Sequence, residues 1–277
     1  MSALPARRPI GVFDSGVGGL TVVKALREHL PREDIFYIGD TARVPYGGKS
    51  PQTLERYSME IAGLLLAEGA KLIVVACNSA SASALPRLRD SLKVPVVGVI
   101  QPGAQAAARS SKTGRIGVIG TRATVQSRAY EEEILKLRPE AQVLSEPCPL
   151  FVPLVEEGFF DDAITHLAAE KYLTDMARAG IDALVLGCTH YPLLAPMIGR
   201  FMGTHVHLID SAETCAYAVE QRLMEHDLMN GPEADPGQLH VALTDAPGAF
   251  FDLVIQTLGL GVKEVESRRV QTYAFTA

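Results

Sequence analysis

Short apolar runs that alternate with helix-length amphipathic stretches constrain the fold of this chain more than any other feature. In the first part of the chain, Ser50–Glu68 has the spacing of an amphipathic helix, with Ser50 as its N-cap and Gly69 just beyond its end. This alternation is typical of βαβ units, so we expect an α/β fold with parallel sheets. The strands predicted around this helix are Pro9–Phe13, Asp34–Ile38, Lys71–Ala76 and Val94–Val99.

The same plan occurs twice along the chain. The segment Arg8–Ser15 resembles Gly114–Thr121 at an offset of 106, and Gly69–Cys77 resembles Gly180–Cys188 at an offset of 111. An insertion of five residues in the second unit reconciles the two offsets. Any two βαβ units share apolar strands, but a cysteine at the same point of both is a stronger correspondence. We interpret the pattern as an internal duplication.

A chain of 277 residues exceeds what one hydrophobic core usually serves, so two lobes are expected. The first unit is predicted to end near Val99 and the second near Asp210. The remaining segments have no counterpart, and we expect them to complete the first lobe. They are predicted as a helix over Ser211–Asp227, a strand over Leu239–Thr244, a helix over Pro247–Leu258 and a strand over Val262–Val265.

The predicted architecture is two pseudo-symmetric lobes, each a flavodoxin-like sandwich with a parallel sheet, with the active site between them. The first lobe is discontinuous and comprises residues 1–98 and 211–277, and the second comprises 99–210.

Charge and cysteine usage exclude several classes of protein. The net charge is −6 and basic residues form no long run, which argues against nucleic-acid or anionic-membrane partners. No apolar core precedes the first strand and no uncharged stretch is long enough to span a bilayer, so neither a signal peptide nor a membrane segment is expected. The four cysteines form no CxxC pair, so neither a disulfide framework nor a metal site is expected. We therefore expect a cytoplasmic protein.

Two of the cysteines occupy positions suited to chemistry. Cys77 and Cys188 each follow an apolar strand and precede a predicted helix, which is the edge of a parallel sheet where ligands bind. Asn78 or Ser79 is expected to cap the first of these helices, and Thr189 the second. A thiolate at a helix N-terminus is stabilised by the helix dipole and the free amides.

Cysteine is also a favoured small core residue, and a single one in this setting would be interpreted that way. Two at matching strand ends favour a functional role. Cys148, between two prolines, and Cys215, within a predicted helix, lack the setting and are expected to be structural.

Further polar residues follow the predicted strands. The glycine-rich Asp14–Gly19 segment allows backbone amides to approach an anion, and Asp14 is placed to steady a thiol or bind an ammonium group. It matches neither the dinucleotide fingerprint nor a P-loop, so taken alone it is a tight turn. The Pro45–Gly48 loop is either a surface turn or a wall of the cleft, which its amides and the Tyr46 hydroxyl would reach. His190 is either a proton partner of Cys188 or an ordinary polar residue of the first helical turn. Glu156, in a loop-like segment, is more often a solvated charge than a catalyst.

Two equivalent thiols suit one kind of chemistry particularly well. A thiol on each side of a substrate carbon can remove a proton from one face and return it to the other, which needs neither a metal nor a cofactor. A cysteine hydrolase needs one nucleophile and one base, so the duplication counts against that class.

Taken together, these motifs resemble the bacterial glutamate racemases over about Pro9 to Ser211. The family usually has Thr where this chain has Ser79, which keeps the hydroxyl. The matching segments are Asp14–Gly19, Pro45–Gly47, Cys77–Ala80, Gly120–Thr121, Glu156–Gly158 and Cys188–His190.

The resemblance implies a cytoplasmic homodimeric isomerase that interconverts L- and D-glutamate without a cofactor and supplies D-glutamate for peptidoglycan. Cys77 would take the proton from the D-isomer and Cys188 from the L-isomer. Asp14 would support Cys77, His190 would support Cys188, and Glu156 would assist. The residues implied to hold the substrate are Asp14, Ser15, Pro45, Tyr46, Gly47, Asn78, Ser79, Thr121, Thr189 and His190.

Two alternatives remain open on the sequence. One is a racemase for aspartate or another amino acid, and the other is a two-lobed small-ligand-binding protein, which has no use for paired thiols. A pyridoxal-dependent racemase is disfavoured because no lysine stands near the glycine-rich or cysteine motifs.

Overall fold

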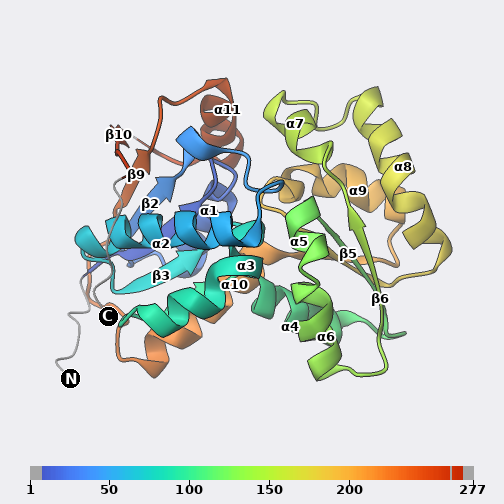
Figure 1. Cartoon of the computed structure of the whole chain (residues 1–277), viewed down its shortest axis with the longest axis horizontal. Coiled ribbons are helices and arrows are strands. Elements are labelled where there is room, and N and C mark those ends of the chain that lie inside the picture. The colour runs from blue at the N-terminus through green and yellow to red at the C-terminus, as the bar shows by residue number, and fades with distance from the viewer. Residues whose placement is uncertain (1–7, 263, 271–277) are drawn as a thin grey trace.

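The computed structural model describes residues 8–262 and 264–270, which form two lobes, each a parallel sheet packed between helices (Figure 1). The predicted α/β class with two related lobes is confirmed. Residues 1–7 and 271–277, the ends of the predicted first lobe, and Lys263, within the predicted last strand, lie outside the described residues. None of the described helices has the length and hydropathy needed to cross a bilayer.

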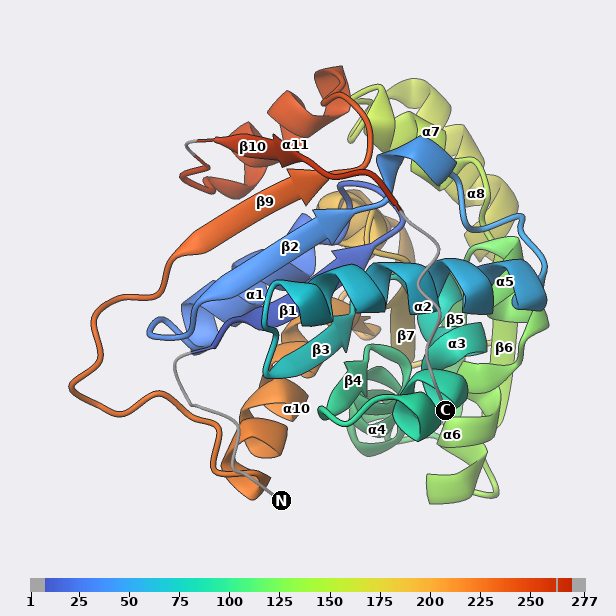
Figure 2. The same ribbon diagram turned by 60° about the vertical axis from the view of Figure 1, so that its left-hand side comes forward.

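Within the described residues, the first sheet has six strands in the order β10-β9-β2-β1-β3-β4, and every pairing is parallel. The late strand β9 pairs with β2, and β10 pairs with β9, so the carboxyl-terminal segment returns to this sheet (Figure 2). Its elements are β1 (Ile10–Asp14), α1 (Leu20–His29), β2 (Ile35–Gly39), the 3₁₀ turn η1 (Thr41–Arg43), α2 (Pro51–Ala67), β3 (Leu72–Val75), α3 (Asn78–Ser91), β4 (Val96–Gly98), α10 (Ser211–Glu225), β9 (Leu239–Leu243), α11 (Ala249–Leu258) and β10 (Val265–Ser267).

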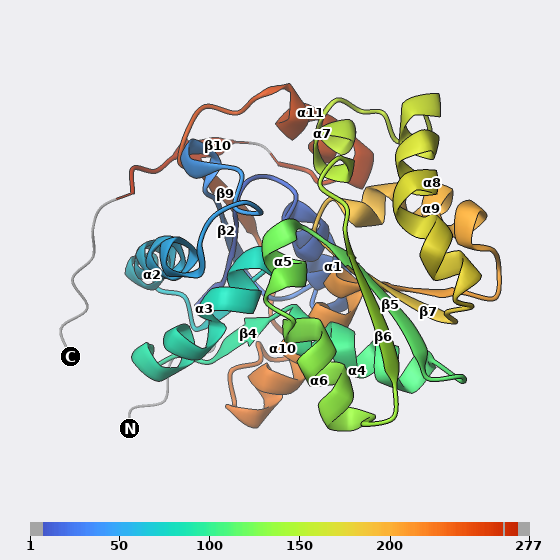
Figure 3. The ribbon, with the colours of Figure 1, turned by 45° about the vertical axis from the view of Figure 1, so that its right-hand side comes forward.

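The second sheet, over the described part of the chain, has four parallel strands in the order β6-β5-β7-β8 (Figure 3). Its elements are α4 (Ile100–Ser110), β5 (Arg115–Gly120), α5 (Arg122–Gln126), α6 (Ala129–Leu137), β6 (Gln142–Pro147), α7 (Phe151–Glu156), α8 (Ala163–Arg178), β7 (Ala183–Gly187), the 3₁₀ turn η2 (Tyr191–Leu194), α9 (Ala195–Met202) and β8 (His207–Asp210).

The period of two along each strand explains why helices cover both faces of the sheets. In β1, Ile10 and Val12 join a core with side chains of α1 and α10, whereas Phe13 joins a separate core with α2 and α3. The same holds in β5, where Ile119 faces the core formed with α7, α8 and α9. The cluster that includes Val12 continues through α10 and α4 into the second lobe, so the two lobes share buried apolar packing.

Both sheets repeat one strand order. If the strands of each unit are counted from its start, the first four lie in the order 2-1-3-4 in both lobes, which agrees with the interpretation of a duplication. The order reverses between the first and third strands, and ligands bind at such a switch point, outside the carboxyl ends. The exact lobe boundaries stay a prediction.

Some predicted elements are displaced or were missed. β10 begins at Val265, so the predicted strand over Val262–Val265 was placed too early. Strand β6 was not predicted, because its side chains are mostly half-buried at the sheet edge and form no apolar run. The predicted helix over Ser50–Glu68 is α2 (Pro51–Ala67). Ser50 is its N-cap, and its side chain accepts a hydrogen bond from the Thr53 amide.

A buried ion pair holds the returning segment against the amino-terminal edge of the first sheet. Lys71 Nζ lies 2.6 Å from Glu33 Oε2, and both side chains are almost fully buried. The Lys71 ammonium also donates to Leu228 O at 2.6 Å, and the backbone N–H of Asn230 donates to Glu33 Oε1 at 2.7 Å. These contacts bind the chain after α10 to the starts of β2 and β3.

We expect Glu33→Gln to destabilise the protein by about 3 kcal/mol, because it removes the carboxylate that lies against a buried ammonium. Glu33→Gln combined with Lys71→Met should recover part of that loss. Urea unfolding measures both effects. The control is Glu28→Gln, which breaks an exposed pair with Lys24 and should cost under about 0.5 kcal/mol. Equal effects of the Glu33 and Glu28 changes would contradict the assignment.

Candidate active site

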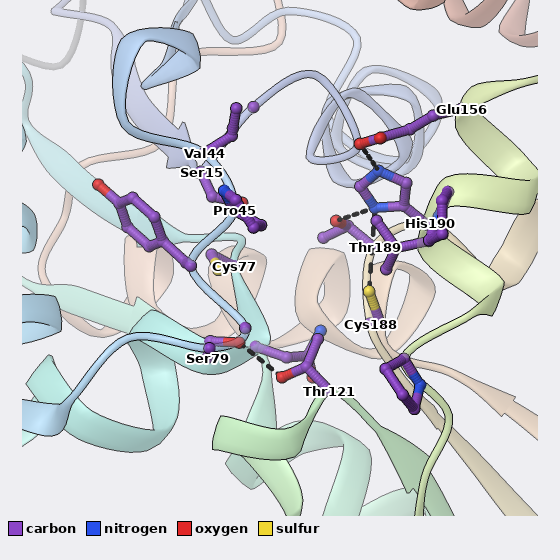
Figure 4. A pocket seen from close by; sticks show the side chains of 18 of the residues that line it. Ser15, Val44, Pro45, Cys77, Ser79, Thr121, Glu156, Cys188, Thr189 and His190 are labelled. Carbon is purple, nitrogen blue, oxygen red and sulfur yellow. Dashed lines mark hydrogen bonds and ion pairs between the residues drawn. The ribbon is translucent and has the colours of Figure 1, made fainter.

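The carboxyl edges of the two sheets border one cavity of about 440 Å³, within the usual range for small-ligand sites. Cys77 follows β3 of the first lobe and Cys188 follows β7 of the second, and both line the cavity (Figure 4). The prediction that both thiols face one cleft is therefore confirmed. The cavity is lined by Ser15, Gly16, Val17, Val44, Pro45, Tyr46, Gly47, Gly48, Cys77, Asn78, Ser79, Thr121, Arg122, Pro149, Val152, Pro153, Glu156, Cys188, Thr189 and His190.

Cys77 is the N-cap of α3, so its thiol lies at the positive end of a helix. Burial nevertheless raises the pKa of Cys77 well above the usual range of a thiol, and the nearby Asp14 carboxylate raises it further. The Ala80 amide and the Ser15 side chain act in the opposite direction. At neutral pH this thiol is therefore protonated when the cavity holds no substrate.

Asp14 ends β1 behind the glycine-rich turn and is fully buried. Its Oδ2 accepts hydrogen bonds from the amides of Gly16 at 3.2 Å and Gly19 at 3.0 Å, while Oδ1 has no partner among the described residues. Burial raises the pKa of Asp14, and the charge of His190 and the backbone amides partly offset this. Asp14 is thus close to both thiol systems without lining the cavity.

Two glycines of this turn are required by close approach. A Cβ at Gly19 would lie 2.4 Å from the Cβ of Asp14, and one at Gly18 would lie 2.6 Å from Thr189 Oγ1. The glycine-rich turn therefore allows the first lobe to touch the segment that carries Cys188. The backbone amides of this turn donate hydrogen bonds to the Asp14 carboxylate.

On the second lobe, Cys188, His190 and Glu156 form a chain of contacts. The Cys188 sulfur lies 3.9 Å from His190 Nδ1, and His190 Nε2 lies 3.2 Å from Glu156 Oε1. Burial works to lower the pKa of His190, but its contacts with Cys188 and Glu156 outweigh this and raise it to about 10. At neutral pH the ring is therefore an imidazolium. Its Nδ1 faces the Cys188 sulfur (Figure 4).

Three local expectations about these segments were wrong. Helix α3 begins at Asn78 with Cys77 itself as its cap, in place of Asn78 or Ser79. After Cys188 the chain forms the 3₁₀ turn η2, whose N-cap is His190 rather than Thr189, and α9 begins only at Ala195. Glu156 is the last residue of the short helix α7 and not part of a loop, and its side chain contacts His190.

The small polar side chains of the cavity bridge the two lobes. Ser79 Oγ lies 2.8 Å from Thr121 Oγ1, which joins the first turn of α3 to the N-cap of α5. Thr189 Oγ1 lies 3.5 Å from His190 Nδ1, and its carbonyl lies 3.3 Å from the Thr21 hydroxyl of the first lobe. These hydroxyls and the adjacent helix amides form a polar wall suited to carboxylate groups.

The loop between β2 and α2 forms the opposite wall, with Pro45, Tyr46 and Gly47 at the cavity. The expectation that the Tyr46 hydroxyl reaches the cavity was wrong, because it donates to the Asp40 carboxylate. Arg43 also donates to Asp40, at 2.6 Å. Asp40, which follows β2 and is fully buried, therefore holds this loop in place through these hydrogen bonds.

Several lining residues were not predicted. Arg122 directly follows the Gly120–Thr121 motif, so its position after a strand was an available signal. Sequence carries no comparable signal for the apolar contributors, because they come from turns and from α7. These are Val17, Val44, Pro149, Val152 and Pro153.

The raised pKa of His190 predicts a specific pH dependence of stability. The folded-state pKa of about 10 exceeds the ordinary 6.5, so the stabilisation is complete below pH 6.5 and is lost as the pH rises through 10. The unfolding free energy of the wild type, minus that of His190→Asn, should fall over this window by on the order of a few kcal/mol. Denaturant unfolding at a series of pH values measures it.

The matched control is His205→Asn, which removes an exposed histidine away from the cavity and should give a flat difference. Parallel stability curves for the wild type and His190→Asn between pH 6.5 and 10 would contradict the assignment.

The comparisons with known proteins agree with this geometry. A family model described as Asp/Glu/Hydantoin racemase matches residues 18–219. A glutamate racemase of Geobacter metallireducens is 51% identical over 252 residues, which cover 91% of this chain and 93% of that relative. The solved structure of the Thermus thermophilus glutamate racemase in complex with β-chloro-D-alanine is 48% identical, with a TM-score of 0.86, and the match covers 96% of this chain and 98% of that one.

A second solved structure, the Francisella tularensis glutamate racemase in complex with D-glutamate, is 38% identical with a TM-score of 0.89. That match covers 97% of this chain and 100% of the other. Similarity on this scale, over both lobes and with two cysteines at equivalent strand ends, shows the family directly. The chain belongs to the Asp/Glu/hydantoin racemase family.

Proposed function

We propose that this chain is a glutamate racemase that interconverts L- and D-glutamate with two thiols and no cofactor. The observation that carries the proposal is the pair Cys77 and Cys188, which project from equivalent strand ends of opposite lobes into one cavity. The similarity to glutamate racemases over both lobes supports glutamate as the substrate.

In the direction from L- to D-glutamate, Cys188 acts as the base. Its sulfur lies 3.9 Å from Nδ1 of the His190 imidazolium, and in its thiolate form it takes the α-proton. Cys77, held as a thiol by burial, delivers its own proton to the opposite face of the α-carbon. The two sulfurs end with exchanged protonation states, and the reverse direction begins from that arrangement.

The supporting residues differ between the two sides. Glu156 accepts from His190 Nε2 and keeps the ring oriented with Nδ1 toward Cys188. Asp14, behind the glycine-rich turn, favours the protonated form of Cys77. Asp14 thus biases Cys77 toward the protonated state in which it begins the conversion of L- to D-glutamate.

The substrate is proposed to bind through its two carboxylates and its ammonium group. The first turn of α3 and the N-terminus of α5 offer amides and hydroxyls that suit carboxylate oxygens. The proposed contacts come from Ser15, Pro45, Tyr46, Gly47, Asn78, Ser79, Thr121, Thr189 and His190, all of which line the cavity. Asp14 is the one predicted contact that does not line it.

The proposed product role follows from the substrate. D-Glutamate made in the cytoplasm would supply peptidoglycan synthesis, as the resemblance to the bacterial enzymes implies. Among the structural relatives, an aspartate racemase of Picrophilus torridus is 18% identical, a level at which likeness shows the fold alone. That likeness therefore does not favour aspartate over glutamate as the substrate.

Replacing either thiol should abolish racemisation while sparing one half-reaction. We expect Cys77→Ser and Cys188→Ser each to lower racemisation of glutamate at least about 10²-fold, because a hydroxyl is too weak an acid to replace a thiol. Elimination of chloride from the enantiomers of β-chloroglutamate reports proton removal alone. Cys77→Ser should retain elimination from the L-isomer, and Cys188→Ser from the D-isomer.

The measurements use protein dialysed against a chelator and free of pyridoxal phosphate. Cys215→Ser, a buried cysteine of α10 that does not line the cavity, is the control and should keep both activities. Loss of the same isomer in both active-site variants rejects the two-base assignment. Faster racemisation of aspartate than of glutamate by the wild type rejects the substrate, and binding without α-proton exchange identifies a ligand-binding protein.

We also propose that the enzyme is a homodimer whose interface is an apolar groove on α7 and α8. Of the eight large apolar side chains exposed among the described residues, four line this groove. Exposed apolar surface concentrated in this way is typical of interfaces. Glu157 and Lys171 line the same groove, so a two-fold axis can pair each with the other on a second copy. The four side chains are Leu150, Phe159, Ile164 and Leu167.

Leu167→Glu should convert the dimer to a monomer, because it places two charges in the centre of the contact. Size-exclusion chromatography with light scattering measures the mass. The control is Leu137→Glu, since Leu137 of α6 is similarly exposed but lies outside the groove. A monomeric wild type, or a variant that remains dimeric, would exclude this interface.

A further inference from the structure

Tyr130 is a buried residue of the second lobe that neither lines the cavity nor belongs to a recognised motif. It lies in the first turn of α6, and only 2% of its side chain is exposed. Its hydroxyl donates a hydrogen bond of 2.7 Å to Asn78 Oδ1, across the boundary between the two sheets. Asn78 directly follows Cys77 and lines the cavity.

The Asn78 amide is satisfied on one side only. Its oxygen accepts from Tyr130, whereas its nitrogen is buried and has no hydrogen-bond partner among the described residues. A buried amide N–H₂ without a partner costs free energy unless a ligand satisfies it. Because Asn78 lines the cavity, a substrate carboxylate oxygen is the acceptor that fits this group.

Tyr130 holds one end of that amide. An asparagine side chain has an acceptor at one end and two donors at the other, and the two orientations are nearly isosteric. With the amide turned over, its N–H₂ group could still donate to the phenolic oxygen, but its own oxygen would face the substrate carboxylates. The bond to Tyr130 therefore holds the amide in place, and a bound carboxylate, which needs a donor, selects the orientation.

The Tyr130 ring is itself held in place by backbone. A Cβ built at Gly103 of α4 would lie 3.2 Å from Tyr130 Cε1, and one at Gly187 would lie 3.2 Å from Cε2. The ring thus packs between two glycines, and Gly187 directly precedes Cys188. Tyr130 therefore contacts the strand end that carries one thiol and bonds to the neighbour of the other.

We infer that Tyr130 is a positioning residue of the racemase site. It holds the Asn78 amide with its N–H₂ group toward the substrate, and it keeps that group in register with the Cys188 strand end. This inference rests on the proposed function, because the ligand it positions Asn78 to bind is glutamate.

The test is Tyr130→Phe, which removes the hydroxyl and keeps the ring that packs between the glycines. We expect KM for both glutamate enantiomers to rise about tenfold with a smaller change in kcat, because a hydrogen bond to a charged group is weakened. On an Asn78→Ala background, Tyr130→Phe should raise KM no further, since the residue it acts through is gone.

Tyr191→Phe is the matched control. Tyr191 is fully buried, and its hydroxyl donates to Cys148 O at 2.8 Å, outside the cavity lining. Tyr191→Phe should lower the thermal unfolding temperature by about as much as Tyr130→Phe does, and it should leave KM unchanged. This separates positioning of Asn78 from a general loss of stability.

The outcomes separate the inference from the proposed function. A wild type that racemises glutamate, with Tyr130→Phe within twofold of its KM, overturns the inference alone. An equal rise in KM on both backgrounds also overturns it, because Tyr130 would then act independently of Asn78. If Tyr130→Phe fails to fold, NMR spectra of the isotope-labelled wild type provide the test. The inference requires the resonances of the Asn78 side-chain N–H₂ group to shift when glutamate binds. A wild type inactive on glutamate rejects the proposed function itself.

Discussion

The convergence of two parallel-sheet edges on one cavity is the constraint on which the rest of the structure depends. In a parallel sheet all strands end on the same side, so the residues that follow them gather at one edge. Here two sheets of the same strand order present these edges to each other, and each contributes a cysteine within two residues of the end of its third strand. Residues more than a hundred positions apart, Cys77 and Cys188, therefore share one small cavity.

The two halves repeat a backbone plan but differ in electrostatics. Cys77 is buried beside the Asp14 carboxylate, whereas Cys188 contacts an imidazolium that Glu156 orients. A duplicated scaffold thus gives its two thiols different surroundings, and in the proposed mechanism one thiol begins as the acid and the other as the base. This arrangement buries several ionisable groups, and burial and their neighbours shift the pKa values of these groups.

Contacts between the lobes keep the two sides in register. Ser79 bonds to Thr121, and the glycine-rich turn at Gly18 touches the segment after Cys188. Below the cavity, one apolar cluster extends from the first sheet through α10 and α4 into the second. Tyr130 belongs to this cluster, and its hydroxyl donates to Asn78 at the cavity. One side chain thus contacts both the shared core and the site.

Local sequence determined the strand and helix alternation, the duplication, the placement of both thiols after strands and the return of the last strands, because these follow from periodicity and from turn and capping residues. Tertiary structure alone decided which partners the long side chains reach. The residue types alone favoured a solvated charge for Glu156 and left open whether the Tyr46 hydroxyl reaches the cavity. In the structure Glu156 contacts His190, and the Tyr46 hydroxyl donates to Asp40. The physical reason is that periodicity encodes which face of an element is buried, whereas the partner of a polar side chain depends on elements that only packing brings together.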